Sequence, residues 1–376
     1  MEFLPRHIDV PNQSFYLFGP RGTGKSAWVK HFYPNSIRID LLRPDLLRHY
    51  QARPERLRDI VASAPSNSAI VIDEVQRVPE LLSVVHGLIE EKRGLRFVLT
   101  GSSARKLRKA GVDLMGGRAV MRSMHPFMAA ELGARFNMDT ALRQGMLPLV
   151  WDAENPEDTL RSYIGSYIRE EVQAEGMVRH LSAFSRFVEV MSLSHAQVLN
   201  IANIARECAT ERKTVEGFIS VLEDLLIAYR LPVFTKRAGR STVSHPKFYY
   251  FDCGVFRTAR PAGPLDHPEG ACGVALEGLV AQHLRAWIDF SRRDHTLHFW
   301  RTRAGSEVDF VVYGPRNFMA IEVKHADHVH STDLRGLKAF HDDYPEAERI
   351  LVYRGSERLR IDGVDCIPCQ DFLFSL

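Results

Sequence analysis

The stretch Ser14–Ser26, SFYLFGPRGTGKS, decides the fold of the amino-terminal part of the chain. Its first five residues predict a short buried strand, and Ala27–Phe32 after it have the pattern of a helix. Between them, Gly19–Ser26 matches the GxxxxGK[ST] pattern of a phosphate-binding loop, in the strand–loop–helix context that this motif requires. Glycines let backbone N–H groups point at phosphate oxygens, next to a helix N-terminus whose dipole favours anions. The sequence therefore predicts a nucleotide site.

Two side chains of this loop have predicted roles of their own. Lys25 is placed to reach the β- and γ-phosphates, and the Ser26 hydroxyl is placed to ligate Mg²⁺. We expect ATP to be held by the whole loop: Gly19, Pro20, Arg21, Gly22, Thr23, Gly24, Lys25 and Ser26.

A second apolar run, Ala69–Ile72, ends in Asp73 and Glu74. This is the Walker B form, in which a parallel strand delivers an acid beside the phosphate loop to hold Mg²⁺. Asp73 is thus a predicted metal ligand, and Glu74 a predicted general base that polarises the attacking water. The alternative is that both acids only cap the next helix.

A third predicted strand, Leu95–Leu99, is followed by Thr100. Its hydroxyl is expected to contact the γ-phosphate or the lytic water; the alternative is a plain strand-to-helix turn with a serine N-cap. Arg118 is the predicted arginine that would stabilise transition-state charge from a neighbouring subunit, with a solvated surface arginine as the alternative. It belongs to a basic group that also includes Arg105, Lys106, Arg108, Lys109 and Arg122.

The middle of the chain has mostly helical periodicity from about Met124, and residues 184–260 predict a winged helix. Helices are expected over residues 198–208 and 211–226. Two wing strands are expected at Leu231–Phe234 and Lys247–Asp252.

Charge in this region favours contact with a DNA backbone. Six Lys or Arg and one acid lie between Leu231 and Arg260, a net charge of +5, and Arg212 and Lys213 open the second helix. The alternative is that the winged helix serves only as a lid or spacer.

The last part of the chain carries a D…ExK pattern. Glu277 lies in a predicted helix, Asp309 on a predicted strand, and Glu322 and Lys324 on the same side of the following strand. Carboxylates that converge on one point need a hard divalent cation, so Glu277, Asp309 and Glu322 are predicted Mg²⁺ ligands, and Lys324 is predicted to position the hydrolytic water. This arrangement is the D…ExK constellation of metal-dependent nucleases. The alternatives to an active nuclease site are a charged, solvated strand face and a nuclease fold that has lost its activity.

Composition limits the class of protein. The 376 residues are 45% hydrophobic and 25% charged, which excludes a disordered, collagen-like or coiled-coil chain. No stretch is long and apolar enough to span a membrane, and the start has no signal-peptide pattern. Five cysteines make no disulfide framework, so we expect a cytoplasmic protein. The formal net charge of +3 does not indicate a nucleic-acid binder by itself.

Nearly the whole sequence resembles prokaryotic AAA+-type ATP-binding proteins with a winged helix and a PD-(D/E)XK nuclease-like carboxyl-terminal domain of unknown function. The matching segments are FYLFGPRGTGKS, IDEVQRVP, LTGSSARKL, HPKFYYFD, WRTR, EVDF and IEVK. The resemblance implies an α/β protein with a P-loop parallel sheet, a winged-helix middle and a restriction-endonuclease-like end. It also implies a homo-oligomer, such as a hexameric ring.

These observations predict three domains, an ATPase at 1–135, a helical and winged-helix domain at 136–262 and a nuclease-like domain at 263–376. The leading hypothesis is an ATP-hydrolysing protein that acts on DNA, whose last domain is a Mg²⁺-dependent nuclease or a DNA-binding relic of one. The alternative is a nucleotide-gated switch that controls assembly or a protein partner without cutting.

Overall fold

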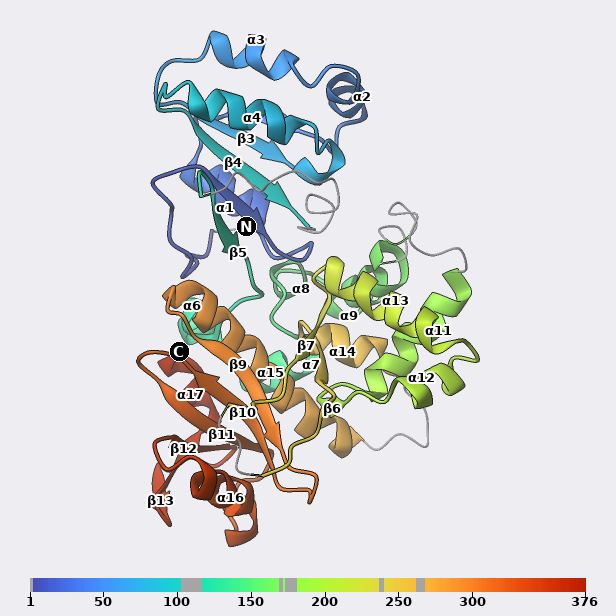
Figure 1. Ribbon diagram of the computed structural model, residues 1–376, viewed down its shortest axis with the longest axis vertical. Coiled ribbons are helices and arrows are strands. Elements are labelled where there is room, and N and C mark those ends of the chain that lie inside the picture. Colours follow the sequence, from blue (N-terminus) through green and yellow to red (C-terminus); the bar gives the residue numbers. More distant parts are fainter. Residues whose placement is uncertain (1–2, 103–116, 169–171, 173–180, 237–239, 262–267) are drawn as a thin grey trace. The chain divides into compact units, whose positions relative to one another are not determined.

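The computed structural model describes residues 3–102, 117–168, 172, 181–236, 240–261 and 268–376 (Figure 1). It separates into two compact units. Unit 1 comprises Met1–His125 with Asp224–Leu226, and unit 2 comprises Pro126–Glu223 with Ile227–Leu376. The division of the second unit into two further domains stays a prediction.

Unit 1 is built on a five-stranded sheet in the order β2-β3-β4-β1-β5, with every neighbouring pair parallel. Its strands are β1 (Phe15–Phe18), β2 (Ile37–Asp40), β3 (Ala69–Asp73), β4 (Arg96–Gly101) and β5 (Val120–Ser123). Its helices are α1 (Lys25–Phe32), α2 (Pro44–Ala52), α3 (Arg56–Ala62), α4 (Leu81–Glu90) and the 3-10 turn η1 (Val75–Arg77). Because the strands are parallel, their carboxyl ends meet at one edge.

Both faces of this sheet are covered, as a parallel sheet requires. Side chains of β1 alternate: Tyr16 and Phe18 join the core cluster that contains residues of α3 and α4, whereas Phe15 packs on Trp28 of α1 with ring centroids 6.1 Å apart. Figure 1 shows α3 and α4 on the same side of β3 and β4. The predicted α/β fold with a parallel sheet is confirmed for this unit.

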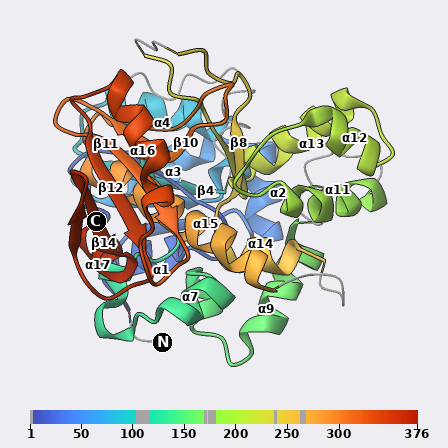
Figure 2. The ribbon, with the colours of Figure 1, turned by 90° about the horizontal axis from the view of Figure 1, so that it is seen from below.

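Unit 2 begins with short helices and a small antiparallel sheet in the order β6-β8-β7. Figure 2 shows α11, α12 and α13 grouped together. The elements are α6 (Ala129–Leu132), η2 (Gly133–Arg135), α7 (Met138–Gln144), α8 (Pro148–Trp151), α9 (Pro156–Ser162), a π-helical turn η3 (Tyr163–Ile168), α11 (Leu181–Leu193), β6 (Gln197–Val198), α12 (Ile201–Glu207), α13 (Arg212–Asp224), β7 (Ala228–Leu231), β8 (Lys247–Tyr250) and α14 (Cys253–Ala259).

The segment predicted as the first wing strand differs from the expectation. Strand β7 ends at Leu231, and the next residues leave the small sheet. The Phe234 amide donates to the Phe299 carbonyl at 2.7 Å, and the Phe234 ring is buried in a core cluster with Trp300 and Phe340. The sequence pattern was ambiguous here because a run such as LPVF suits either sheet.

The rest of unit 2 is a six-stranded mixed sheet in the order β13-β14-β12-β11-β10-β9. Strands β9, β10 and β11 are antiparallel neighbours, and β11, β12 and β14 are parallel. Figure 2 shows α16 against β10–β12. The elements are α15 (Pro268–Ser291), β9 (Thr296–Arg301), β10 (Glu307–Tyr313), β11 (Phe318–Lys324), η4 (Ser331–Leu334), α16 (Arg335–Asp343), β12 (Glu348–Tyr353), β13 (Leu359–Ile361), β14 (Val364–Pro368) and α17 (Cys369–Ser375).

Candidate nucleotide site and carboxylate cluster

The predicted phosphate loop runs from the end of β1 to the start of α1. Gly24 directly precedes α1 with φ of 89°, a left-handed conformation that favours glycine. Gly19 is required for a different reason, since a Cβ there would lie 2.4 Å from the Met124 carbonyl oxygen. The loop is therefore shaped by glycines at both of its ends.

The Lys25 side chain lies inside this loop. Its ammonium group donates to the carbonyl oxygens of Gly19 at 2.7 Å and Pro20 at 3.1 Å, and the residue is 6% exposed. The two carbonyl oxygens accept the hydrogen bonds that phosphate oxygens would accept, so Lys25 is held close to where a nucleotide would bind.

The loop has a partner that the motif did not reveal. Arg6 donates to the carbonyl oxygen of Thr23 at 2.9 Å and to that of His125 at 2.7 Å. The Thr23 hydroxyl in turn donates to the Pro20 carbonyl at 2.7 Å. A single arginine before the first strand has no local pattern to mark it, so sequence reasoning missed Arg6.

Asp73, at the end of β3, is brought beside the loop as predicted by the Walker B pattern. The Ser26 hydroxyl donates to one oxygen of the Asp73 carboxylate at 3.1 Å, and the buried Thr100 hydroxyl donates to the other. A serine hydroxyl next to a carboxylate is a suitable ligand pair for a hard cation such as Mg²⁺. The chemistry of the donor set therefore fits the predicted ion.

Glu74 is held by the predicted site residue Thr100 and by two side chains, Gln76 and Ser102, that were not predicted as site residues. Its backbone has φ of 57°, and its amide donates to the Thr100 hydroxyl at 3.3 Å. Its carboxylate accepts hydrogen bonds from the Gln76 amide and, at 3.4 Å, from the Ser102 hydroxyl. A left-handed backbone on a residue other than glycine is strained, and such strain gathers at functional sites.

Arg118 is not brought to this site within its own chain. It lies two residues before β5, at the amino ends of the parallel strands, whereas the phosphate loop follows the carboxyl end of β1, and it forms an ion pair with Glu90 at the end of α4. Arg105, Lys106, Arg108 and Lys109 lie outside the described residues.

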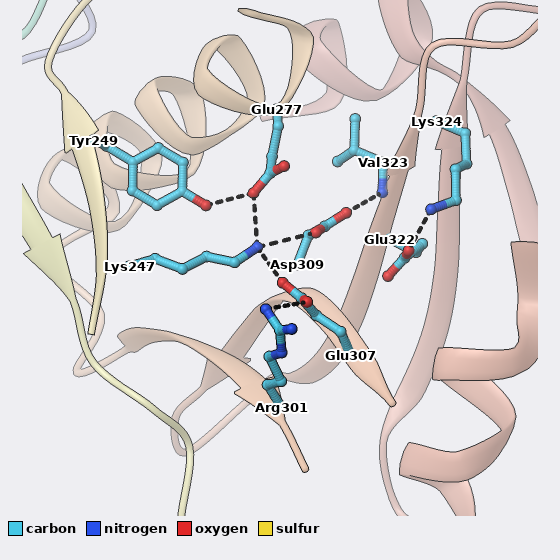
Figure 3. Close-up of polar contacts among 9 residues, drawn as sticks. All are labelled: Lys247, Tyr249, Glu277, Arg301, Glu307, Asp309, Glu322, Val323 and Lys324. Carbon is cyan, nitrogen blue, oxygen red and sulfur yellow. Dashed lines mark hydrogen bonds and ion pairs between the residues drawn. The ribbon is translucent and has the colours of Figure 1, made fainter. Parts of the chain in front are cut away.

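Asp309 of the D…ExK pattern, together with Glu277 and Glu307, surrounds a lysine of unit 2 instead of an open space (Figure 3). The Lys247 ammonium lies 2.6 Å from Glu307, 3.0 Å from Glu277 and 3.3 Å from Asp309, measured to the nearest carboxylate oxygen. The Lys247 side chain is only 3% exposed. Lysine almost never occupies such a position unless it is paired.

Burial and like charges perturb this cluster. Burial first, and the neighbouring Asp309 second, raise the pKa of Glu277 to about 7, although Lys247 opposes the rise. Burial alone would lower the pKa of Lys247, but Glu277, Asp309 and Glu307 raise it well above its usual value. Lys247 is therefore charged at neutral pH.

Glu322 and Lys324 form a separate pair at 2.6 Å (Figure 3). Burial and then the Asp309 charge raise the pKa of Glu322 well above its usual value. The second oxygen of Glu322 is buried without a hydrogen-bond partner among the described residues. Asp309 instead accepts from the Val323 amide at 3.0 Å, through the oxygen that faces away from Lys247.

These donors do not make a metal site. In the part of the chain that the structure describes, no group of three or more His, Cys, Asp or Glu is arranged to hold a metal ion. The predicted ligands Glu277, Asp309 and Glu322 are brought to one region, but Lys247 lies among the acids. The signal for Lys247 was its place in KFYYF, where Lys247 and Tyr249 share one side of a strand. The Tyr249 hydroxyl donates to Glu277 at 2.6 Å.

Other basic residues of the predicted wing are also engaged within unit 2. Lys236 lies 4.1 Å from the centre of the Tyr313 ring. Arg240 donates to the Ala339 carbonyl at 2.9 Å and pairs with Asp342 at 3.1 Å. Arg237 lies outside the described residues. The local charge of +5 therefore does not describe a free basic surface.

Comparison with known protein families assigns part of the chain. Residues 11–133 match an AAA domain, residues 135–266 match a domain of unknown function (DUF8612), and residues 272–372 match another domain of unknown function (DUF4143). Two uncharacterized proteins, from Mycobacterium tuberculosis and Mycobacterium bovis, are 24% identical over 332 residues, covering 85% of this chain and 72% of theirs.

Similarity to solved structures is weak. A signal-transduction ATPase with numerous domains and a tetratricopeptide repeat sensor, from Pyrococcus horikoshii, has a TM-score of 0.21 at 12% identity. The match covers 75% of this chain and 46% of that one. A Vibrio cholerae protein has the same TM-score at 11% identity, covering 96% and 95% of the two chains. These scores are too low to support an argument about function.

None of the helices within the described ranges is long and apolar enough to cross a membrane. The amino-terminal part of the chain therefore matches an AAA domain, and the carboxyl-terminal part matches a domain of unknown function.

Proposed function

We propose that this protein is a Mg²⁺-dependent ATPase whose nucleotide cycle acts on DNA through unit 2. The observation that carries the ATPase part is the contact of Ser26 with Asp73 at 3.1 Å, next to a glycine-bounded loop that encloses Lys25. ATP would be held by the backbone of residues 19–26 and by Lys25, as their motif predicts.

Each residue of the site has one task in this proposal. Mg²⁺, when bound, would offset negative charge on the β- and γ-phosphates. Ser26 and Asp73 would hold the ion, and Thr100 orients Asp73 through its hydroxyl. Glu74 would accept a proton from the attacking water once its carboxylate is released from Gln76 and Ser102.

Phosphate release from ATP tests this assignment. We expect Lys25→Ala to abolish nucleotide binding, and Glu74→Gln to retain binding while lowering kcat by about 10²–10⁴-fold. The matched controls are Lys30→Ala, an exposed lysine of α1, and Glu80→Gln, an exposed acid before α4. Unchanged turnover in Lys25→Ala and Glu74→Gln would refute the site.

Action on DNA is the second part of the proposal. It is supported by Arg212 and Lys213, which are exposed in the first turn of α13. Assembly into a homo-oligomer, such as a ring, belongs to the same proposal, because Arg118 can serve a nucleotide only from a neighbouring chain.

A nucleotide-gated switch that controls a protein partner is the second candidate. The observation that favours it is the engagement of Lys236, Arg240 and Lys247 inside unit 2, which leaves less positive charge for DNA. DNA that neither binds nor stimulates ATP hydrolysis would favour this candidate.

A further inference from the structure

The carboxylate cluster of unit 2 has its own cation. We infer that Lys247 takes the place that a divalent metal would need among Glu277, Glu307 and Asp309, so that this centre is metal-independent and does not cleave DNA by metal-assisted hydrolysis. The inference concerns unit 2 alone and does not depend on the proposed ATPase site in unit 1.

The position of the Lys247 ammonium group supports the inference that it stands where a metal ion would be needed. Lys247 contacts three carboxylates within 3.3 Å, and these come from α15 and β10, the elements predicted to supply metal ligands. Several buried carboxylates are stable only when a cation compensates them. The lysine already supplies that compensation.

Further contacts engage the oxygen atoms of Asp309, Glu277 and Glu307. One oxygen of Asp309 contacts Lys247 and the other accepts from the Val323 amide. One Glu277 oxygen accepts from both Lys247 and Tyr249. A metal would have to displace these donors and gain little charge compensation in return, since Arg301 also pairs with Glu307 at 3.3 Å.

With all three carboxylates ionised, the two cations leave the cluster with a net charge of −1, and a proton on Glu277 makes the cluster neutral. The unpartnered oxygen of Glu322 adds one candidate ligand, but its other oxygen is held by Lys324. A single oxygen is not a site for Mg²⁺, which prefers octahedral coordination.

Lys247 also connects two parts of unit 2. It lies on β8, the central strand of the small sheet, whereas Asp309 and Glu307 lie on β10 of the six-stranded sheet. A metal would bind acids within the carboxyl-terminal part alone, but the lysine joins that part to the small sheet. The ion pairs of Lys247 therefore hold the small sheet and the six-stranded sheet of unit 2 together.

Mn²⁺ binding to the full chain, measured by electron paramagnetic resonance without nucleotide, tests the inference. The parent protein carries Asp73→Asn, so that the site of unit 1 does not contribute. We expect well below one bound Mn²⁺ per chain in this parent. Adding Lys247→Met should create about one site per chain, because the carboxylates then lack their ammonium, and adding Asp309→Asn should remove it.

Thermal unfolding supplies the second measurement. Lys247→Met should lower Tm by on the order of 10 °C, since it leaves buried carboxylates uncompensated. Adding Glu277→Gln to Lys247→Met should recover part of that loss. The control is Lys338→Met, which breaks a surface ion pair with Asp362 and should change Tm little.

Two results would overturn the inference. One is a parent that binds one Mn²⁺ per chain and loses it on Asp309→Asn; this comparison decides the matter even if Lys247→Met does not fold. The other is a Lys247→Met protein with an unchanged Tm. Neither result would affect ATP hydrolysis in unit 1, so failure of this inference is distinguishable from failure of the proposed function.

Discussion

The Arg6 guanidinium donates a hydrogen bond to the carbonyl oxygen of Thr23 at 2.9 Å and thereby fixes the phosphate loop from outside its own motif. The other terminal nitrogen of the same guanidinium donates to the carbonyl oxygen of His125. His125 is the last residue of unit 1 in this part of the chain. Arg6 is 9% exposed, so the fork is held in one geometry. The loop is thus supported by a planar guanidinium group that donates to two carbonyl oxygens at once. A lysine could not replace it, because its ammonium group does not present two donors in a fixed plane.

Replacing Arg6 should impair nucleotide binding more than turnover. We expect Arg6→Lys to raise KM for ATP about tenfold with a smaller change in kcat, because the loop loses support but keeps Lys25 and Glu74. Steady-state phosphate release measures both constants. Arg53→Lys, at an exposed position of unit 1, is the control. An Arg6→Lys enzyme with wild-type KM would show that the contact is only structural.

Replacing Thr100 should change the Mg²⁺ dependence of ATP hydrolysis. Its buried hydroxyl donates to Asp73 and accepts from the Glu74 amide, so Thr100→Val removes both contacts at nearly constant volume. We expect ATPase activity to fall by about 10–100-fold at limiting Mg²⁺, as for other residues that orient a metal ligand. A Mg²⁺ titration of activity measures the effect, with the exposed Thr296→Val as control. An unshifted Mg²⁺ dependence would contradict this role.

Local sequence patterns predicted which residues of unit 1 lie together at the phosphate loop, because these patterns are short and stand at strand ends; that the residues bind nucleotide stays a prediction. Gly24, Lys25 and Asp73 lie where a loop after β1 and an acid after β3 should meet. Arg6 could not be found this way, since its partner His125 is 119 residues distant. Only tertiary packing brings the two together.

The carboxylate cluster was predicted in part, for a similar reason. Asp309 and Glu322 were placed on neighbouring strands by their hairpin, and they are there. Lys247 lies 62 residues from Asp309, on a strand assigned to a wing. Phe234 explains the wrong wing strand: its ring is more favourably buried beside Trp300 than exposed on a wing tip.

Arg118 should act on the nucleotide of a neighbouring chain. It lies before β5 at the amino ends of the strands, whereas the phosphate loop follows the carboxyl end of β1, so it cannot serve its own Lys25 site. We expect Arg118→Ala to lower kcat by about 10³-fold or more. Mixing Arg118→Ala with Lys25→Ala chains should restore part of the activity, because the Lys25→Ala chain supplies Arg118 and the Arg118→Ala chain supplies an intact phosphate loop. No recovery on mixing, with Arg118→Ala itself active, would remove this residue from the site.

Arg212 and Lys213 should contribute nonspecific DNA affinity. Replacing both with alanine should weaken binding about equally for all duplex sequences and reduce the salt slope of log K by about 2, since two phosphate contacts are lost. Fluorescence anisotropy at several salt concentrations measures this slope. Lys236→Ala is the matched control, because that ammonium already faces the Tyr313 ring. Equal slopes in wild type and the double variant would place DNA contact elsewhere or nowhere.

Buried neutral histidine should make unit 2 sensitive to acid. The His283 Nε2 accepts from the Ala129 amide at 2.9 Å, and its Nδ1 lies 2.8 Å from the Leu279 carbonyl. Burial lowers the pKa of His283 to about 4, although the Leu279 carbonyl and Glu131 oppose the shift. The unfolded chain, with a histidine pKa near 6.5, therefore takes up a proton before the folded chain does.

The sign of the pH effect follows from this difference in proton uptake. The stabilising contribution of neutral His283 is complete above about pH 6.5 and is lost by up to ~1.4 kcal/mol per pH unit as the pH falls toward about 4. His283→Gln keeps an acceptor for the Ala129 amide but cannot titrate. We therefore expect urea unfolding to show wild type losing stability relative to His283→Gln between pH 6.5 and 4.5, whereas the exposed His328→Gln should track wild type. A constant gap between wild type and His283→Gln over this range would mean that His283 takes up its proton equally in the folded and unfolded chains, and the Ala129 amide would then need another acceptor at low pH.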